Sequence, residues 1–180
     1  MEDRQRKQET EKTEGQRLEE QLCFKFPHIG AEAPEQRAEA DAFCQGYKAF
    51  LDAGKTEREC VAEALRQLEA AGYQPVDYSR QYQPGDKVYA VNRNKALLIT
   101  TFGKKPVKEG VRINGAHIDS PRLDLKPNPL YEKHDIGYFK THYYGGIRKY
   151  QWGTVPLAMH GVVVKKNGEL VEVCLGEAED

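Results

Sequence analysis

Apolar residues recur at helical spacing between residues 34 and 53. Four of them fall at i, i+4, i+7 and i+8 and so share one face of a helix: Phe43, Tyr47, Phe50 and Leu51. Gly54 follows and fits the left-handed residue that commonly ends a helix. The pattern therefore predicts a helix over residues 34–53.

A capping signal predicts a second helix directly afterwards. Thr56 fits an N-cap, and Glu59 stands three residues later, where its side chain completes a capping box. The apolar residues that follow share one face: Val61, Ala64, Leu65 and Leu68. Gly72 ends this helix, so we expect the two helices to form a hairpin.

The pattern then changes to strands. Residues 87–92 and 96–101 read as two strands joined through Arg93-Asn94. The second is almost continuously apolar, which is typical of a central strand covered on both faces. A third strand is predicted over residues 111–116, and it leads directly into His117.

The second half of the chain predicts strands and turns without a helix. Residues 126–129, Lys-Pro-Asn-Pro, form a rigid, non-helical stretch. Asn167-Gly168 stands between two strand-like segments, residues 161–166 and 169–175. Because Asn-Gly accepts the positive φ angles of a type I′ turn, a hairpin is predicted there.

Composition excludes two classes of partner. The chain is 39% hydrophobic and 31% charged, with a formal net charge of -1, so it has no broad attraction for nucleic acid. Apolar runs fall short of the roughly 20 residues of a membrane span, and the N-terminus lacks a signal-peptide core. A cytoplasmic protein without a membrane partner is expected. We interpret the scattered cysteines as free thiols: Cys23, Cys44, Cys60 and Cys174.

Candidate chemistry lies where the third predicted strand ends, at His117 and Asp119. In an extended segment these side chains project to the same side. The carboxylate can accept one ring N–H and leave the other nitrogen as a lone pair for a metal. A bare His-x-Asp triplet more often belongs to a structural histidine bonded to a neighbouring carboxylate, so the triplet alone is weak evidence for a metal site. Ser120 lacks the Gly-x-Ser-x-Gly turn of a serine hydrolase.

The other chemical side chains carry weaker signals. No two of His134, His142 and His160 stand at helical i, i+4 spacing, so structural or surface roles are expected for them. The aromatic-rich stretch over residues 138–152 is expected to serve sheet packing or an oligomer contact.

The residues around His117 resemble a known family. Residues 115–121, Gly-Ala-His-Ile-Asp-Ser-Pro, are similar to the Gly-Ala-His-Thr-Asp-Ser-Pro segment of the aspartyl aminopeptidase family of zinc metalloaminopeptidases. Residues 144–147 resemble its Tyr-Gly-Gly-Gly-Ile segment with one glycine fewer, and residues 157–165 resemble its Leu-Ala-Gly-Arg-Val strand. The similarity covers roughly residues 36–180, and its departures indicate a divergent bacterial-type branch.

The resemblance implies an α/β fold. We expect the N-terminal part of a zinc-exopeptidase α/β domain, with a helix hairpin and a mixed sheet, at residues 34–125. The start of an inserted β-rich dimerisation domain, truncated, is expected at residues 126–180. Residues 1–33 are expected to be a charged flexible tail or linker, since residues 1–22 carry charges of both signs and few apolar side chains.

The resemblance also implies zinc-dependent removal of N-terminal residues from peptides by a metal-activated water. His117 matches a zinc ligand of the family's two-zinc site, and Asp119 matches the residue that orients this ligand. The other ligands and the general base lie downstream in the family pattern, so this chain alone is expected to bind zinc weakly and to be inactive. Peptide substrates and a homo-oligomer formed through the β domain are the implied partners. The alternative is a truncated, non-catalytic homologue that associates with full-length aminopeptidase subunits.

Overall fold

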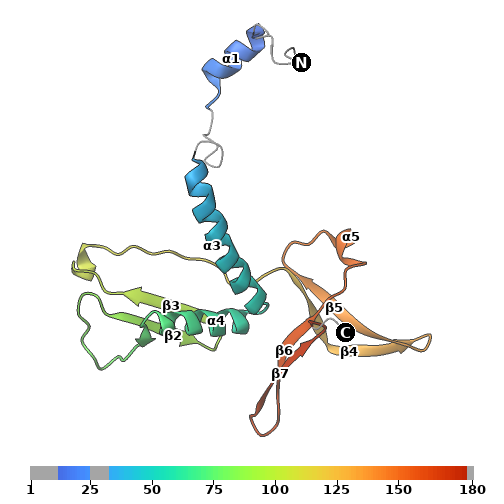
Figure 1. Ribbon diagram of the computed structural model, residues 1–180. Helices are drawn as coiled ribbons and strands as arrows, with labels where there is room; N and C mark the ends of the chain where they lie inside the picture. Colours follow the sequence, from blue (N-terminus) through green and yellow to red (C-terminus); the bar gives the residue numbers. More distant parts are fainter. Residues whose placement is uncertain (1–11, 25–32, 178–180) are drawn as a thin grey trace, which may run out of the picture. The chain divides into compact units, whose positions relative to one another are not determined.

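The computed structural model describes residues 12–24 and 33–177, and it is of mixed α/β type, as predicted (Figure 1). The chain divides into two compact units, residues 1–46 and 47–180. Within the described ranges the strands form three small sheets, ordered β1-β2-β3, β4-β5 and β6-β7. The domain limits expected at residues 33/34 and 125/126 stay predictions.

The first unit holds helix α1, Glu14–Leu22, and the start of helix α3, Pro34–Ala53. The charged flexible tail or linker expected over residues 1–33 stays a prediction, and residues 1–11 and 25–32 of it lie outside the described residues. Helix α1 forms because Thr13 and Gln16 make a capping box: the Gln16 backbone N–H donates to Thr13 Oγ1, and the Thr13 N–H donates to Gln16 Oε1. The bounds predicted for the helix over residues 34–53 are confirmed by α3.

The predicted capping box is confirmed at helix α4, Glu57–Ala70. The Thr56 N–H donates to Glu59 Oε2 at 2.8 Å, and the Glu59 N–H donates to Thr56 Oγ1 at 3.3 Å. Gly72 follows the helix at φ +82°, as expected for a glycine that ends a helix. Local sequence thus determines where α4 begins and ends.

Gly54 serves a different purpose from the predicted one. Its φ lies outside the left-handed region, so it is not a left-handed helix stop. A Cβ at this position would lie 2.8 Å from Cys60 Sγ and 3.2 Å from Cys60 Cα. Glycine is needed because the buried Cys60 thiol packs against this backbone and donates to the Gly54 carbonyl at 3.3 Å.

The core of the second unit lies between α4 and the first sheet. Strand β2, Lys87–Asn92, pairs antiparallel with β3, Ala96–Thr101, and parallel with the short β1, Gln74–Pro75. The buried apolar residues of the described chain come from α4 and β2: Cys60, Val61, Val88 and Tyr89. The Tyr89 hydroxyl donates to Glu69 Oε1 at 2.8 Å and thereby fastens the helix to the strand. The predicted turn at Arg93-Asn94 is confirmed, with both residues at positive φ.

Two strand predictions are wrong for one physical reason. β3 is an edge strand of its sheet, not a covered central strand, and Leu98 and Ile99 are 67% and 49% exposed. Residues 111–116 form no strand; they follow the short 3-10 helix η1, Val107–Glu109, as irregular chain. A strand exists only where a neighbour accepts and donates its backbone hydrogen bonds, and the described residues offer no such neighbour beyond β3.

The second half contains two hairpins and a single helical turn. Strands β4, Arg122–Lys133, and β5, Ile136–Tyr144, join through His134-Asp135, both at positive φ. Their register shifts between Leu125 and Leu130, where Pro127 and Pro129 cannot donate to the ladder. Helix α5, Lys149–Trp152, is a short exception to the expectation of no helix.

The last hairpin, β6, Met159–Val164, with β7, Leu170–Leu175, confirms the predicted pairing but not the turn type. Gly168 has φ +85°, but Asn167 does not have positive φ, so the type I′ assignment is wrong. The Gly168 N–H bonds the Lys165 carbonyl at 2.9 Å, and the Lys165 N–H bonds the Glu169 carbonyl at 2.8 Å. This is a three-residue loop in which a turn is followed by a left-handed glycine, the next most common hairpin connection after the two-residue turns.

Two sequence expectations concern the whole chain. All four cysteines are free thiols, as interpreted, with Cys60 buried and the others exposed. Among the described residues, no helix is both long and apolar enough to cross a membrane.

Replacing Gly54 with alanine should destabilise the start of α4. The added Cβ would collide with Cys60, so we expect the free energy of opening of the α4 amides to fall by about 1–3 kcal/mol. Gly46→Ala is the matched control: nothing lies within 4 Å of its Cβ position inside α3, so it should stabilise its own helix by about 0.5–1 kcal/mol. Hydrogen exchange measures both. Equal effects at the two glycines would contradict the close packing.

Candidate functional site

The irregular segment before β4 presents His117 to solvent. Its side chain is 83% exposed, and its Nδ1 lies 2.9 Å from the Asp119 carbonyl oxygen and 3.1 Å from Asp119 Oδ1. A carbonyl and a carboxylate can only accept, so Nδ1 carries the hydrogen and donates to both. The Nε2 lone pair is left free and exposed.

Asp119 is held from its other side by a residue distant in sequence. The Tyr144 hydroxyl donates to Asp119 Oδ2 at 2.7 Å, so the two carboxylate oxygens have different partners. The hydrogen bond from Tyr144, followed by those from its own backbone and His117, lowers the pKa of Asp119. The same contact raises the pKa of Tyr144, because the phenolate would face a carboxylate.

Arg122 holds the tyrosine ring. Its guanidinium carbon lies 4.1 Å from the centroid of the Tyr144 ring, directly across the β4–β5 ladder. Arg122 also pairs with Asp124 at 2.8 Å and with Glu57, in the first turn of α4, at 3.0 Å. Partial burial opposes its charge, but the hydrogen bond that Arg122 donates to Asp124 and the charges of the two carboxylates raise the pKa of Arg122. A continuous set of contacts thus joins α4 to His117.

The turn after β5 brings Tyr144 to its place. Gly145 has φ +74°, and a Cβ there would lie 3.4 Å from Pro121 Cα. Glycine is favoured here by the left-handed backbone, and the turn lies in ordinary contact distance of Pro121. Proline at 121 ends the irregular segment where β4 begins.

A second histidine is enclosed by carboxylates. His160, on β6, has Nδ1 2.8 Å from Glu59 Oε1 and Nε2 2.8 Å from Glu177 Oε1. The hydrogen bond to Glu59 raises the pKa of His160 despite partial burial. Partial burial also opposes the charge of Glu59, but the hydrogen bonds from His160 and Thr56 lower its pKa. His160 therefore links α4 to the last hairpin through two carboxylates.

The remaining sequence candidates are placed apart from His117. His134 lies in the β4–β5 turn, and His142 stacks on Tyr143 while its Nδ1 contacts the Tyr143 carbonyl. Among the residues that the structure describes, no three His, Cys, Asp or Glu side chains are grouped to hold a metal ion. His117 is thus a single donor with a prepared orientation.

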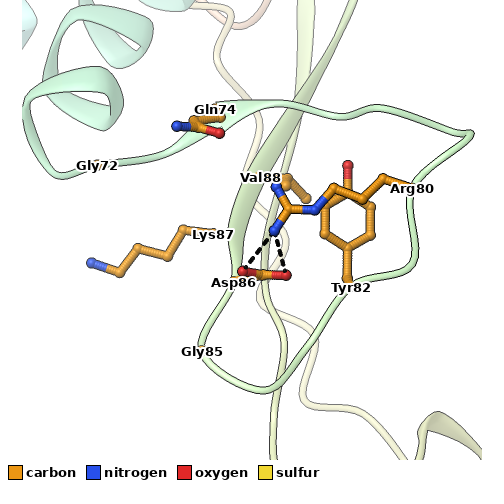
Figure 2. Close-up of a pocket in the computed structure, with 8 residues that line it drawn as sticks. All are labelled: Gly72, Gln74, Arg80, Tyr82, Gly85, Asp86, Lys87 and Val88. Atoms are coloured by element: carbon orange, nitrogen blue, oxygen red, sulfur yellow. Dashed lines mark hydrogen bonds and ion pairs between the residues drawn. The ribbon is translucent and has the colours of Figure 1, made fainter.

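One surface cavity of about 290 Å³ lies elsewhere, between the end of α4 and the start of β2 (Figure 2). Arg80 reaches across it to Asp86, with Nη2–Oδ2 at 3.1 Å, and also lies over the Tyr82 ring. The cavity shares no residue with the His117 contacts. Of its two cations, Arg80 is paired with Asp86, and Lys87 donates to the Ala71 carbonyl. The cavity carries no evident chemistry.

Sequence reasoning identified His117 and Asp119 as a pair but missed the residues that hold them. The sequence predicts no role at this site for Tyr144, which belongs to the Tyr-Gly-Gly segment, or for Arg122. Both act on Asp119 through contacts that span more than twenty residues. The glycines of the Tyr-Gly-Gly segment were the available signal, because glycine in a strand-like segment often marks a bend or the close approach of another backbone.

Comparison with known proteins agrees with the sequence resemblance. A family model described as aminopeptidase I zinc metalloprotease (M18) matches residues 50–178. A probable M18 family aminopeptidase 1 of Clostridium acetobutylicum is 51% identical over 150 residues, which cover 81% of this chain and 32% of that protein. A probable M18 family aminopeptidase 1 of Thermotoga maritima is 44% identical over 142 residues, 79% of this chain and 31% of that protein.

Solved structures give the same result. The crystal structure of aminopeptidase I from Borrelia burgdorferi B31 superposes with a TM-score of 0.77 at 40% identity, covering 81% of this chain and 36% of that chain. The crystal structure of an M18 family aminopeptidase from Thermotoga maritima superposes with a TM-score of 0.70 at 45% identity. The chain spans about a third of the length of the curated relatives that it matches.

The His160 link should make stability depend on pH. The pKa of His160 is raised above 6.5 in the folded state, so its contribution is complete below pH 6.5 and is lost as pH rises through the raised value. The pKa of Glu59 is lowered below 4.5, so its contribution is present above pH 4.5 and is lost as pH falls through the lowered value. The stabilisation that this link contributes is greatest between pH 4.5 and pH 6.5.

His160→Gln tests this dependence. Urea unfolding of the wild type should show a free energy of unfolding that decreases as pH rises above 6.5, and the variant should lose that part of the slope. His142→Gln is the control, because the Nδ1 of His142 faces a carbonyl and no carboxylate. An unchanged slope in His160→Gln would show that the link contributes nothing.

Proposed function

The chain belongs to the M18 family of zinc aminopeptidases, and we propose that it supplies the first metal ligand of such an enzyme, His117, together with the carboxylate that orients it, Asp119. The reaction would be removal of N-terminal residues from peptides. On its own the chain would be inactive, because the other ligands and the general base would come from parts of the family fold that this chain does not cover.

The observation that carries this proposal is the state of the His117 ring. Nδ1 is occupied by two acceptors of Asp119, and Nε2 is a free, exposed lone pair. A metal-binding histidine needs this arrangement, with one nitrogen donating to a carboxylate or carbonyl and the other facing the ion. His160, by contrast, uses both nitrogens for carboxylates and has no lone pair left for an ion.

The described residues fit one position of a zinc site and not a whole site. When bound, zinc supplies a Lewis acid and a water of lowered pKa. His117 would give the ion one nitrogen, and Asp119 would fix the tautomer and the ring plane of that histidine. Since catalytic zinc takes about three protein ligands and no group of three occurs among the described residues, the site must be completed from elsewhere.

The exposed apolar surface supports completion by further polypeptide. β3 has a free edge, and its Leu98 and Ile99 side chains face solvent. Segments equivalent to the rest of the M18 fold would pair with this edge and cover these side chains. They would belong either to a longer protein of which this chain is part or to full-length subunits with which it associates.

Self-association through the β4–β5 hairpin is the proposed oligomer contact. Its exposed residues include several large apolar or aromatic side chains: Leu130, Tyr131, Ile136, Tyr138, Phe139 and Tyr143. Aromatic side chains of this kind are enriched at subunit interfaces. Peptides would be the substrates of the completed site.

The zinc content of the purified chain tests whether it lacks a complete site. After dialysis we expect far less than one zinc per chain and no release of N-terminal residues from peptides, since one imidazole is too few ligands. Elemental analysis and a peptide assay measure these. Stoichiometric zinc with peptidase activity would overturn the proposed incompleteness.

Zinc titration observed by histidine-selective NMR tests the ligand itself. Zinc at high concentration should shift the His117 ring signals, starting at Nε2, and His117→Gln should remove this response. His134→Gln should leave the response in place, because His134 lies in the distant β4–β5 turn. A response at His134 but none at His117 would contradict the assignment.

A further inference from the structure

The hydroxyl of Tyr144 is placed to control His117 without touching it. We propose that Tyr144 is a positioning residue: its hydroxyl fixes the Asp119 carboxylate, which in turn fixes the His117 ring with Nε2 directed outward. What His117 binds rests on the proposed function, but the positioning of its ring does not.

The Asp119 carboxylate is shared between two partners. Oδ1 accepts from His117 Nδ1 at 3.1 Å, and Oδ2 accepts from the Tyr144 hydroxyl at 2.7 Å. A carboxylate with a single partner can rotate about its Cβ–Cγ bond. With its second oxygen held by a residue of another strand, its plane is fixed, and so is the direction from which it accepts the imidazole N–H.

Tyr144 is itself held in place by Arg122. The Arg122 guanidinium lies over its ring at 4.1 Å and is held by Glu57 and Asp124. The ring is therefore clamped from one side by a group that α4 and β4 both anchor. The hydroxyl is directed by packed elements and not by a freely rotating side chain.

The contacts of the Tyr144 ring do not depend on its hydroxyl. The contact at this turn is made by Gly145 against Pro121, so phenylalanine at position 144 would keep both the turn and the ring under Arg122. Residue 144 is also 40% exposed, so its hydroxyl could be satisfied by water. The hydroxyl contact with Asp119 is thus not required to fill a core or to satisfy a buried group.

Tyr143 provides a matched control on the same strand. Its exposed fraction, 46%, is close to that of Tyr144, and its ring also lies under a cation, Lys149. Within the described residues its hydroxyl makes no hydrogen bond, and its neighbours are Lys149 and the His142 ring. Loss of this hydroxyl changes nothing at Asp119.

The test is the order of the His117 ring in the complete 180-residue chain, measured by ¹³C relaxation with labelled histidine at a fixed pH at which the ring is neutral. Asp119→Ala sets the value for an unheld ring. Tyr144→Phe should move the His117 order parameter and ring ¹⁵N shifts toward that value, and Tyr143→Phe should leave both at the wild-type value. Wild-type values in Tyr144→Phe, with a shift in Asp119→Ala, would overturn the proposal.

A second measurement avoids any change at Tyr144, in case that variant does not fold. Asp119→Asn alters an exposed loop and should shift the ¹³Cζ signal of Tyr144 while leaving that of Tyr143 in place. An unchanged Tyr144 signal would show that the hydroxyl does not bind the carboxylate, and would also overturn the proposal.

Zinc added to the same samples separates this proposal from the proposed function. If Tyr144→Phe loosens the ring while zinc shifts no His117 signal in the wild type, positioning stands and the metal role fails. If zinc shifts His117 but Tyr144→Phe leaves the ring unchanged, the metal role stands and positioning fails. Where both hold, loss of Tyr144 should weaken zinc binding by about tenfold in a completed site, the lower end of the range for residues that orient ligands.

Discussion

The shared carboxylate of Asp119 is the interaction on which the candidate site depends. It joins an irregular segment to the end of β5, because His117 holds one oxygen and Tyr144 the other. Without it the exposed histidine would have only a backbone carbonyl to set its ring, and the lone pair would have no fixed direction. Arg122 packs on the Tyr144 ring, and the turn at Gly145 contacts Pro121, so both help to hold Tyr144 next to this carboxylate.

The structure around this site is supported by few buried side chains. The buried apolar residues of the described chain lie between α4 and β2, and the hairpins are held chiefly by their own ladders and by polar links such as His160. A two-stranded hairpin is marginal alone in water. This sparse packing accords with the membership of the chain in a family whose members are about three times longer, and it explains why we propose that other segments complete the fold.

Sequence reasoning succeeded where the determinants are local. The Thr56–Glu59 capping box and the helix bounds follow from residues within one turn of each other. It failed at Gly54, because the Cys60 thiol six residues later is what requires a glycine there. It also failed at residues 111–116, because the described residues offer no neighbouring strand with which they could pair. His117 and Asp119 were found because they lie two positions apart in the sequence. The hydroxyl that holds Asp119 comes from Tyr144 at the end of β5, 25 residues later. Contacts of that kind cannot be inferred from spacing.

The most direct test of this account is the tautomer of His117 in the intact chain, read from long-range ¹H–¹⁵N correlations of the neutral ring. The account predicts a hydrogen on Nδ1, bound to Asp119, and an unprotonated Nε2 whose ¹⁵N signal lies far from that of Nδ1. A ring that carries its hydrogen on Nε2, or that averages the two nitrogens as a free histidine does, would contradict it. In either case Asp119 would not be preparing His117 to bind a metal ion.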